Sequence, residues 1–252
     1  MTRLKSLSLA LGLVAIGWAA APASAAQTNV AVAANFTDAA KEIASAFKQK
    51  TGHEAVLSFG SSGQLYAQIT QDAPFQILLS ADDERPKKLV DEGLGVETGR
   101  FTYAVGKLVL WSKAAGTVNG EETLKAAAFN KISIANPTAA PYGAAAIEAM
   151  KALRIYDALQ PKIVQGNSIA QAFQFIDTGN AELGFIAASQ LAGNDSGSRW
   201  TVPQTLYTPI RQDAVLLKKG QGQEAAVAFM AFLKGPEARA IILKFGYAGD
   251  GS

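Results

Sequence analysis

Short apolar runs alternate with longer amphipathic stretches along most of this chain. Residues 29–34 (NVAVAA) form the first apolar run, which is typical of a buried strand. In residues 37–49, Ala40, Ile43 and Phe47 recur at a spacing of three or four and form one apolar face, as in an amphipathic helix. Gly52 follows this stretch and is a natural helix end. The opening of the chain therefore predicts a strand followed by a helix.

The same alternation continues to the C-terminus. Further strands are predicted at residues 54–59, 75–79, 107–112, 132–135, 183–187 and 215–217. Further helices are predicted to begin at Ser62 and Pro86 and to cover residues 144–153, 170–178, 224–233 and 236–245. Thr37, Ser62 and Ser168 are the expected helix caps. Strands that alternate with helices predict layered α/β architecture with largely parallel sheets.

The first residues have the pattern of a secretory leader. Arg3 and Lys5 precede an apolar stretch at residues 7–21, and Ala23-Ser24-Ala25 is a small-residue cleavage motif. A membrane anchor is the alternative, but this apolar core is short for a span. We expect residues 1–25 to be a signal peptide, cleaved after Ala25 or Ala26. Because no cysteine is present to carry a lipid, we expect a protein of the periplasm that is neither membrane-inserted nor lipid-anchored.

Composition narrows the class of protein. Without cysteines there are no disulfides, so the hydrophobic core must stabilise an exported fold. Of the 23 basic residues, Arg3 and Lys5 lie in the leader, which leaves 21 basic residues against 21 acidic ones. This balance argues against binding to nucleic acid or to a membrane surface. The length suits one large α/β domain or two small ones.

Four polar loops without lysine or arginine each lie between a predicted strand and a predicted helix. They are residues 34–37, 60–63, 136–143 and 166–169. In open α/β sheets, ligands bind beyond the carboxyl ends of strands, where such loops meet. The N-terminus of a helix presents unpaired N–H groups and a partial positive charge, which suits an anion. The alternative for each loop is that it only caps its helix.

The absence of charge also restricts which anion these loops could bind. From residue 57 to residue 71 no side chain carries a formal charge. The loops offer donors, and the Tyr142 hydroxyl could be one of them. Phosphate keeps a proton near neutral pH and favours an acceptor carboxylate, whereas a fully deprotonated dianion needs only donors. The loops therefore favour a sulfate-like or molybdate-like ion.

Catalysis has little support in the sequence. His53 is the only histidine, so metal clusters and Ser-His-Asp sites are nearly excluded, and its place in a helix–strand turn predicts a surface residue. Gln64 stands where a nucleophile elbow needs glycine. Trp111 and Trp200 are expected in the core or at a domain edge and not as ligand stackers. A secreted hydrolase that uses Ser61 or Ser62 remains a distant alternative, and so does a sensor of small organic ligands.

Several spaced motifs resemble one known family. They are residues 33–37 (AANFT), 59–63 (FGSSG), 79–82 (LSAD), 183–186 (LGFI) and 232–238 (FLKGPEA). In this order they resemble the periplasmic molybdate-binding proteins of ABC transporters. The resemblance implies the type II periplasmic-binding-protein fold, with two three-layer α/β lobes joined by two crossover strands. It places residues 27–104 plus 209–252 in one lobe and 105–208 in the other, with crossings near 103–106 and 207–211.

The resemblance also implies where the anion binds. The donors would be the Asn35 side chain and amide, the Ser62 hydroxyl and amide, and the amides of Tyr142 and Ile169, with Ala34, Ser61 and Ala187 as weaker candidates. Two positions depart from the family. Ala187 stands where some members use a tyrosine hydroxyl, and Gln76 stands where the family often has aspartate.

The function implied by the resemblance is transport. We expect a monomeric, non-enzymatic receptor without a cofactor, which closes its lobes over molybdate or tungstate and delivers the anion to an ABC permease. Another tetrahedral oxyanion, such as sulfate, is the nearest alternative.

Overall fold

The computed structural model describes residues 25–249. The expected leader, with Arg3, Lys5 and most of its cleavage motif, lies outside the described residues. Within the described part of the chain, no helix combines the length and the apolar character needed to cross a bilayer.

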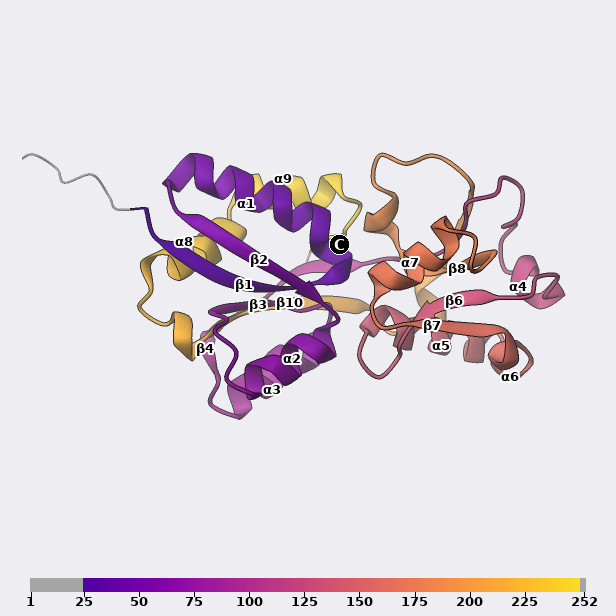
Figure 1. Ribbon diagram of the computed structural model, residues 1–252, viewed down its shortest axis with the longest axis horizontal. Coiled ribbons are helices and arrows are strands. Elements are labelled where there is room, and N and C mark those ends of the chain that lie inside the picture. The colour runs from indigo at the N-terminus through magenta and orange to yellow at the C-terminus, as the bar shows by residue number, and fades with distance from the viewer. Residues whose placement is uncertain (1–24, 250–252) are drawn as a thin grey trace, which may run out of the picture.

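The described chain forms two lobes, each built on a five-stranded sheet (Figure 1). The first sheet has the order β2 (Glu54–Gly60), β1 (Gln27–Ala33), β3 (Ile77–Leu79), β10 (Ile210–Leu217) and β4 (Gly95–Gly106). The second has the order β7 (Ile163–Gly166), β6 (Ile132–Ala135), β8 (Leu183–Ala187), β5 (Leu108–Ser112) and β9 (Ser198–Thr201).

Both sheets are mixed, so the expectation of largely parallel sheets was wrong. Strand β1 pairs in parallel with β2 and β3, but β10 runs antiparallel to β3 and β4. In the second sheet, β5 is antiparallel to β8 and β9. The reason is the path of the chain: β4 leads out of the first lobe, and β10 brings the chain back beside it in the opposite direction. The long strand β4 was not predicted as a strand.

Helices cover both faces of each sheet and so make the expected three layers (Figure 1). In the first lobe, α1 (Thr37–Thr51), α8 (Glu224–Leu233) and α9 (Pro236–Lys244) lie on one face, and α2 (Ser62–Thr70) and α3 (Glu84–Asp91) on the other. In the second lobe, α7 (Ile169–Asp177) lies opposite α5 (Pro141–Ala152) and α6 (Tyr156–Leu159), with α4 (Glu122–Ala126) at the far end. The 3-10 turns are η1 (Ala34–Phe36), η2 (Gln160–Lys162), η3 (Ala188–Leu191), η4 (Gln204–Leu206) and η5 (Lys218–Gly220).

The alternation of side chains along β1 shows why the first sheet needs two helical layers. Val30 and Val32 belong to the core cluster that includes α1 and α8, whereas Ala31 belongs to the cluster that includes Leu65 of α2. Successive side chains of a strand point to opposite faces, so an apolar run without polar positions is buried on both sides. The apolar runs of the sequence therefore become central strands.

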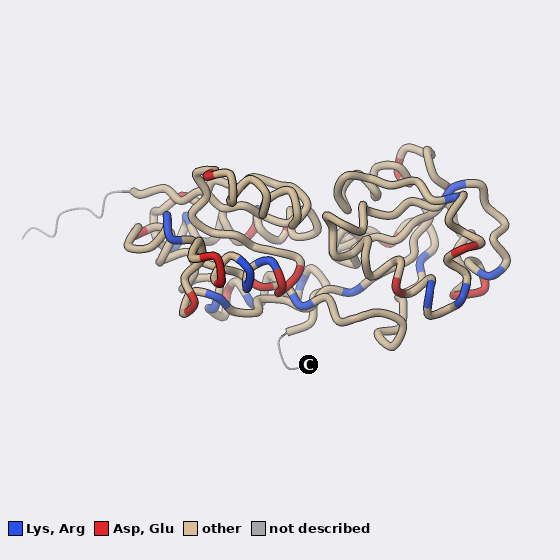
Figure 2. Tube along the Cα trace, turned by 90° about the horizontal axis from the view of Figure 1, so that it is seen from below, with Lys and Arg blue, Asp and Glu red and all other residues tan. Residues whose placement is uncertain are grey.

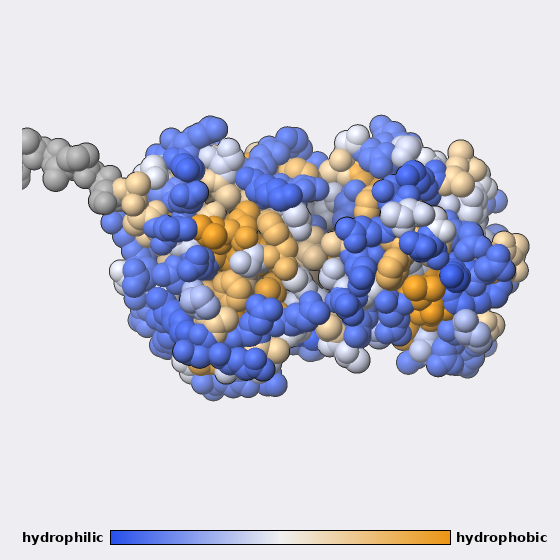
Figure 3. Space-filling view, in the orientation of Figure 1, coloured by the Kyte–Doolittle hydropathy of each residue, from blue (hydrophilic) through white to orange (hydrophobic). Residues whose placement is uncertain are grey.

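The outer edge of the first sheet is less protected. Strand β2 is an edge strand, and Phe59 near its end is 41% exposed. Figure 3 shows apolar residues gathered over the middle of this lobe. The Lys41 ammonium lies 5.7 Å from the centre of the Phe59 ring, which places a charge beside the edge.

Two helix ends follow the predicted signals, whereas two expected caps do not, and α3 and α5 begin at Glu84 and Pro141, two or three residues before their predicted starts. Gly52 ends α1 in the left-handed conformation (φ 77°), and the Ser168 hydroxyl accepts from the Gln171 amide at the start of α7, both as predicted. Thr37 instead follows the turn η1, and its hydroxyl donates to the Ala34 carbonyl. Helix α2 is capped by Ser61, so Ser62 is its first helical residue rather than its cap.

His53 is buried, so the prediction of a surface residue was wrong. Its side chain lies beside the Phe47 ring, and its Nδ1 accepts a hydrogen bond from the Ala26 amide at 3.2 Å. The start of β1 therefore covers this imidazole. Trp111 is buried in the second lobe as predicted.

An ion pair fastens the two strands that join the lobes. Asp213 of β10 is buried, and its carboxylate accepts from Arg100 Nη1 and from the Thr102 hydroxyl of β4, both at 2.7 Å. Burial raises the pKa of Asp213, and both of these partners act in the opposite direction. The ladder between β4 and β10 shifts its register between Gln212 and Asp213, so the ion pair lies beside a bulge in the strand pairing.

Asp213→Asn should lower the free energy of unfolding by about 1–3 kcal/mol, because it leaves the Arg100 guanidinium without its counter-charge. This is less than for a fully buried pair, since the Arg100 side chain is 28% exposed. Urea unfolding measures the effect. As a control, Asp91→Asn removes an exposed ion pair with Lys87 and should change stability by less than about 0.5 kcal/mol. Equal effects of the two substitutions would contradict this account.

Candidate functional site

A small cavity lies between the two lobes. Its free space, counted together with the solvent at its mouth, is about 200 Å³. The residues that line it come from both lobes and from five separate chain segments: Ala33, Ala34, Asn35, Ser61, Ser62, Ala81, Ala140, Pro141, Tyr142 and Ile169. Six of the seven predicted binding residues are therefore brought together, namely Asn35, Ser62, Tyr142, Ile169, Ala34 and Ser61.

Three helix N-termini converge on this cavity. Ser62 and Ile169 are the first residues of α2 and α7, and Tyr142 is the second residue of α5, after Pro141. Amides at these positions have no intrahelical acceptor, and the helix dipole adds a partial positive charge. The turn η1 brings Asn35 to the same space from the end of β1. The arrangement concentrates hydrogen-bond donors around a compact volume, which suits a small anion.

The donors are neutral. Among the described residues, those that line the cavity include no lysine, arginine, aspartate or glutamate. Figure 2 shows charged residues mainly on the outer parts of both lobes, and the loops that face each other in its upper half are largely uncharged. An anion in this cavity would be held by N–H and O–H dipoles, and a protonated oxyanion would find no carboxylate to accept its proton.

The two serines at the start of α2 differ in their hydrogen bonding. The Ser62 hydroxyl accepts from the Ala81 amide at 2.9 Å, so its own proton is directed elsewhere. The Ser61 hydroxyl oxygen is buried and has no hydrogen-bond partner among the described residues. Because buried polar groups are nearly always paired, an unpaired hydroxyl at the cavity indicates a position where a ligand would complete the bonding. Both hydroxyls can donate into the cavity.

The Asn35 side chain is already hydrogen-bonded within the protein, whereas the resemblance implied that it donates to the anion. Its side-chain amide donates to the Gln212 carboxamide oxygen at 2.9 Å and to the Tyr247 hydroxyl at 3.0 Å. A primary amide has two N–H groups, and both are used within the protein. The Asn35 backbone amide remains as the donor on this side of the cavity.

The Tyr142 hydroxyl is also engaged away from the cavity. It accepts from the Gln212 carboxamide nitrogen at 3.1 Å, and its ring is buried. Burial raises the pKa of Tyr142 well above its ordinary value, so the phenol stays neutral. The hydroxyl is the acceptor in this bond, so its own proton is not used there, and the backbone amide is the donor that the start of α5 presents to the cavity.

The two positions that depart from the family lie elsewhere. Ala187 is buried at the end of β8, where its amide donates to the Gln190 side chain, and it is outside the set of described residues that line the cavity. Gln76 lies before β3, and its side-chain oxygen accepts from the Asn29 amide. Gln76 is likewise outside the set of described residues that line the cavity.

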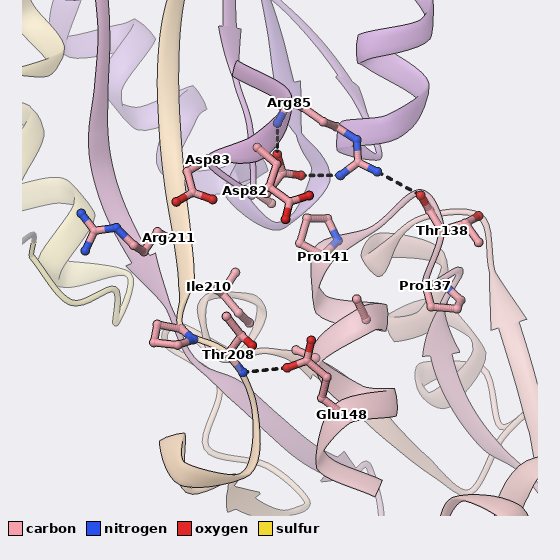
Figure 4. Close-up of a pocket in the computed structure, with 15 residues that line it drawn as sticks. Asp82, Asp83, Arg85, Pro137, Thr138, Pro141, Glu148, Thr208, Ile210 and Arg211 are labelled. Atoms are coloured by element: carbon pink, nitrogen blue, oxygen red, sulfur yellow. Dashed lines mark hydrogen bonds and ion pairs between the residues drawn. The ribbon is translucent and has the colours of Figure 1, made fainter. Parts of the chain in front are cut away.

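The lobes touch beside the cavity, so the structure is closed (Figure 3). The Gly63 amide donates to the Ala139 carbonyl at 2.9 Å, and Arg85 donates to the Thr138 carbonyl at 2.9 Å. Figure 4 shows Arg85 between Asp82 and Thr138, at a groove that both lobes and the returning chain at residues 208–211 line. Asp82 forms an ion pair with Arg85.

A polar network behind the cavity was not predicted from the sequence. It contains Gln212, Tyr103, Tyr247 and Ser189, which contact Asn35, Tyr142 or each other. The only sequence signal was the pair Gln212-Asp213, which interrupts the last apolar strand. A polar pair within a buried strand needs partners, but the sequence does not indicate which residues supply them.

Comparisons with known proteins show the family of this chain. Residues 28–248 match the family described as bacterial extracellular solute-binding protein. The molybdate-binding protein ModA of Rhodobacter capsulatus is 53% identical over 245 residues, 97% of this chain and 95% of that protein. Its namesake in Azotobacter vinelandii is 51% identical over 246 residues, 96% of this chain and 98% of that protein.

A solved structure has a similar fold. The Azotobacter vinelandii periplasmic molybdate-binding protein superposes with a TM-score of 0.85 at 41% identity, covering 88% of this chain and 98% of that one. The two-lobed α/β fold is thus common to both chains.

Alanine at the two serines should affect stability differently. Ser62→Ala leaves the buried Ala81 amide unpaired and should lower the free energy of unfolding by about 1–3 kcal/mol. Ser61→Ala removes an unpaired buried hydroxyl and should leave stability within about 0.5 kcal/mol of the wild type, or above it. Denaturant unfolding without added anions compares the two variants. A larger loss for Ser61→Ala would show that its hydroxyl is paired.

Proposed function

Since the chain belongs to the family of bacterial extracellular solute-binding proteins, we propose that it captures molybdate in the cavity between its lobes. The observation that carries the proposal is the convergence of three helix N-termini and two serine hydroxyls on a cavity lined by neutral described residues. Relatives more than 50% identical over nearly their whole length are named for molybdate binding. As a member of this family, the chain binds a solute and is not an enzyme.

The proposed mechanism is capture by closure. Ser61 and Ser62 present hydrogen-bond donors from the first lobe. Tyr142 and Ile169 present backbone amides from the second lobe. Closure brings both sets around the dianion and removes it from water, which strengthens each hydrogen bond. Bonds to a charged acceptor contribute about 1.5–3 kcal/mol each, so a few suffice for tight binding after the cost of association. Cavity size then selects among dianions.

The wider role follows from the family. We propose that the mature protein works in the periplasm as a monomer, after removal of residues 1–25 and without a lipid anchor. It also accepts tungstate, needs no cofactor, and delivers its anion to an ABC permease. The division into lobes at 27–104 plus 209–252 and 105–208 is proposed as well. Strand β4 ends at Gly106 and β10 begins at Ile210, close to both proposed boundaries.

The alternatives differ in what the site must contain. Sulfate is also a dianion that needs only donors, so it remains the nearest competitor. A serine hydrolase would need its histidine beside Ser61 or Ser62, but His53 precedes β2 and Ser61 follows it, which separates them by about 20 Å of strand. A sensor of organic acids would need a charged partner for a carboxylate, and the described residues that line the cavity supply none.

Calorimetric titration of the mature protein tests the anion. Molybdate and tungstate should bind more tightly than sulfate and much more tightly than phosphate, because phosphate retains a proton that no lining carboxylate accepts. Ser61→Ala and Ser62→Ala should each weaken molybdate binding by about one to two orders of magnitude, the loss of one bond to a charged group. Sulfate binding as tight as molybdate binding would overturn the assignment.

Gly63→Ala should impair closure. A Cβ at Gly63 would lie 2.9 Å from the Ala139 Cα of the other lobe, and such an approach to backbone cannot be relieved by a rotamer change. We expect molybdate binding to weaken at least tenfold while the melting temperature without ligand stays near that of the wild type. Gly52→Ala is a contrasting variant: its built Cβ meets no atom within 4 Å, but its positive φ should cost stability instead of affinity. Unchanged affinity in Gly63→Ala would mean that closure does not require this contact.

A further inference from the structure

Gln212 connects the two walls of the cavity. Its carboxamide oxygen accepts from the Asn35 side-chain amide at 2.9 Å and from the Tyr103 hydroxyl at 3.1 Å. Its carboxamide nitrogen donates to the Tyr142 hydroxyl at 3.1 Å. Asn35 and Tyr103 belong to the first lobe and Tyr142 belongs to the second. The carboxamide oxygen of Gln212 therefore bonds to the first lobe, and its nitrogen bonds to the second.

The position of Gln212 is as informative as its bonds. It is fully buried on β10, the strand on which the chain returns to the first lobe, and it lies opposite Ala104 of β4, near the end where the chain leaves. Asn35 and Tyr142 line the cavity from opposite sides, and Gln212 stands behind both of them. Any opening of the lobes that moves Tyr142 away from Asn35 must therefore stretch or break a bond to Gln212.

Gly106 provides the space for this connection. A Cβ at Gly106 would lie 2.1 Å from the Tyr142 hydroxyl and 2.7 Å from the Gln212 carboxamide nitrogen. Its φ is outside the left-handed region, so the glycine is required here for space and not for backbone conformation. The residue at the end of β4 thus lets a tyrosine from one lobe meet a glutamine from the other.

A second contact joins the lobes at the same place. The Ser189 hydroxyl of η3, in the second lobe, donates to the Asn35 carbonyl at 2.8 Å, and the Tyr247 hydroxyl donates to that carbonyl at 2.7 Å. Asn35 is therefore held through its side chain by Gln212 and through its backbone by Ser189. Together these bonds fix the η1 turn whose amide faces the cavity.

We propose that Gln212 is a positioning residue for anion capture, which holds the closed state by linking Tyr142 of the second lobe to Asn35 of the first. The proposal rests on the proposed function for its ligand. Gln212 does not touch the anion; it favours the closed arrangement with or without it. In the closed state the Gln212 carboxamide makes its hydrogen bonds out of contact with water. Opening of the lobes would expose these bonds to water. Anion release should therefore be slower with Gln212 than without it.

Gln212→Met is the direct test, since methionine has similar length and volume but cannot bond to any of the three partners. Each protein is loaded with molybdate and mixed with an excess of isotopically distinct molybdate, and the bound isotope is followed over time. We expect Gln212→Met to release molybdate at least about tenfold faster, because the closed state loses its buried bonds.

Tyr142→Phe provides the second variant. It removes only the hydroxyl that accepts from Gln212 and keeps both the ring and the backbone amide at the cavity. It should also release molybdate faster, and the double variant should be no faster than Gln212→Met, because one bond is shared. Ser133→Ala is the matched control: its buried hydroxyl donates to the Ala172 carbonyl, so its loss should lower stability and leave release unchanged.

Release at the wild-type rate in both variants, or fully additive effects in the double variant, would overturn the proposal. Small-angle scattering without ligand separates it from the proposed function. If the wild type binds no molybdate, the proposed function fails, and the ligand-free radius of gyration still decides the role of Gln212. A larger radius in Gln212→Met than in the wild type supports that role, and equal radii refute it.

Discussion

Unpaired backbone N–H groups at three helix N-termini are the constraint on which this molecule depends. Each N-terminus needs an acceptor, and in the closed structure α2, α5 and α7 direct theirs into one cavity between the lobes. The strands place these helices, because each helix begins just beyond the carboxyl end of a strand. The sheets, the closing contact at Gly63 and the neutral serines all serve one arrangement of donors.

The sequence predicted the elements with a strong local signal. Apolar runs such as residues 132–135 and 183–187 became strands with those limits, and Ser168 and Gly52 marked helix ends correctly. The long strand β4 was missed because charged and polar residues fill its first half, and the mixed sheets were missed because strand direction depends on the path of the chain. His53 was misplaced because the segment that covers it, at Ala26, is distant in sequence.

As with the helices and strands, the parts of the site that have a local signal in the sequence could be predicted. Loops that follow strands gather at one edge of a sheet, so the spacing indicated the loops, and the family resemblance implied six of the residues that line the cavity. The partners of Asn35 and Tyr142 could not, because Gln212 lies 177 and 70 positions away from them. Hydrogen bonds over such separations leave no periodic pattern in the chain. The sequence thus indicated the inner surface of the cavity but not what supports it.

Because the cavity is lined by neutral residues, dissolved salt should have little effect on how it discriminates among anions. A lysine or arginine would attract anions of every kind over about 8–10 Å at physiological ionic strength, and dissolved salt would weaken that attraction. The field of peptide dipoles falls off faster with distance than that of a charge, so this cavity distinguishes anions only at contact. Dissolved chloride, which is abundant but cannot reach all five lining segments at once, competes poorly. Discrimination then varies little with salinity, which suits a compartment whose salt concentration follows that outside the cell.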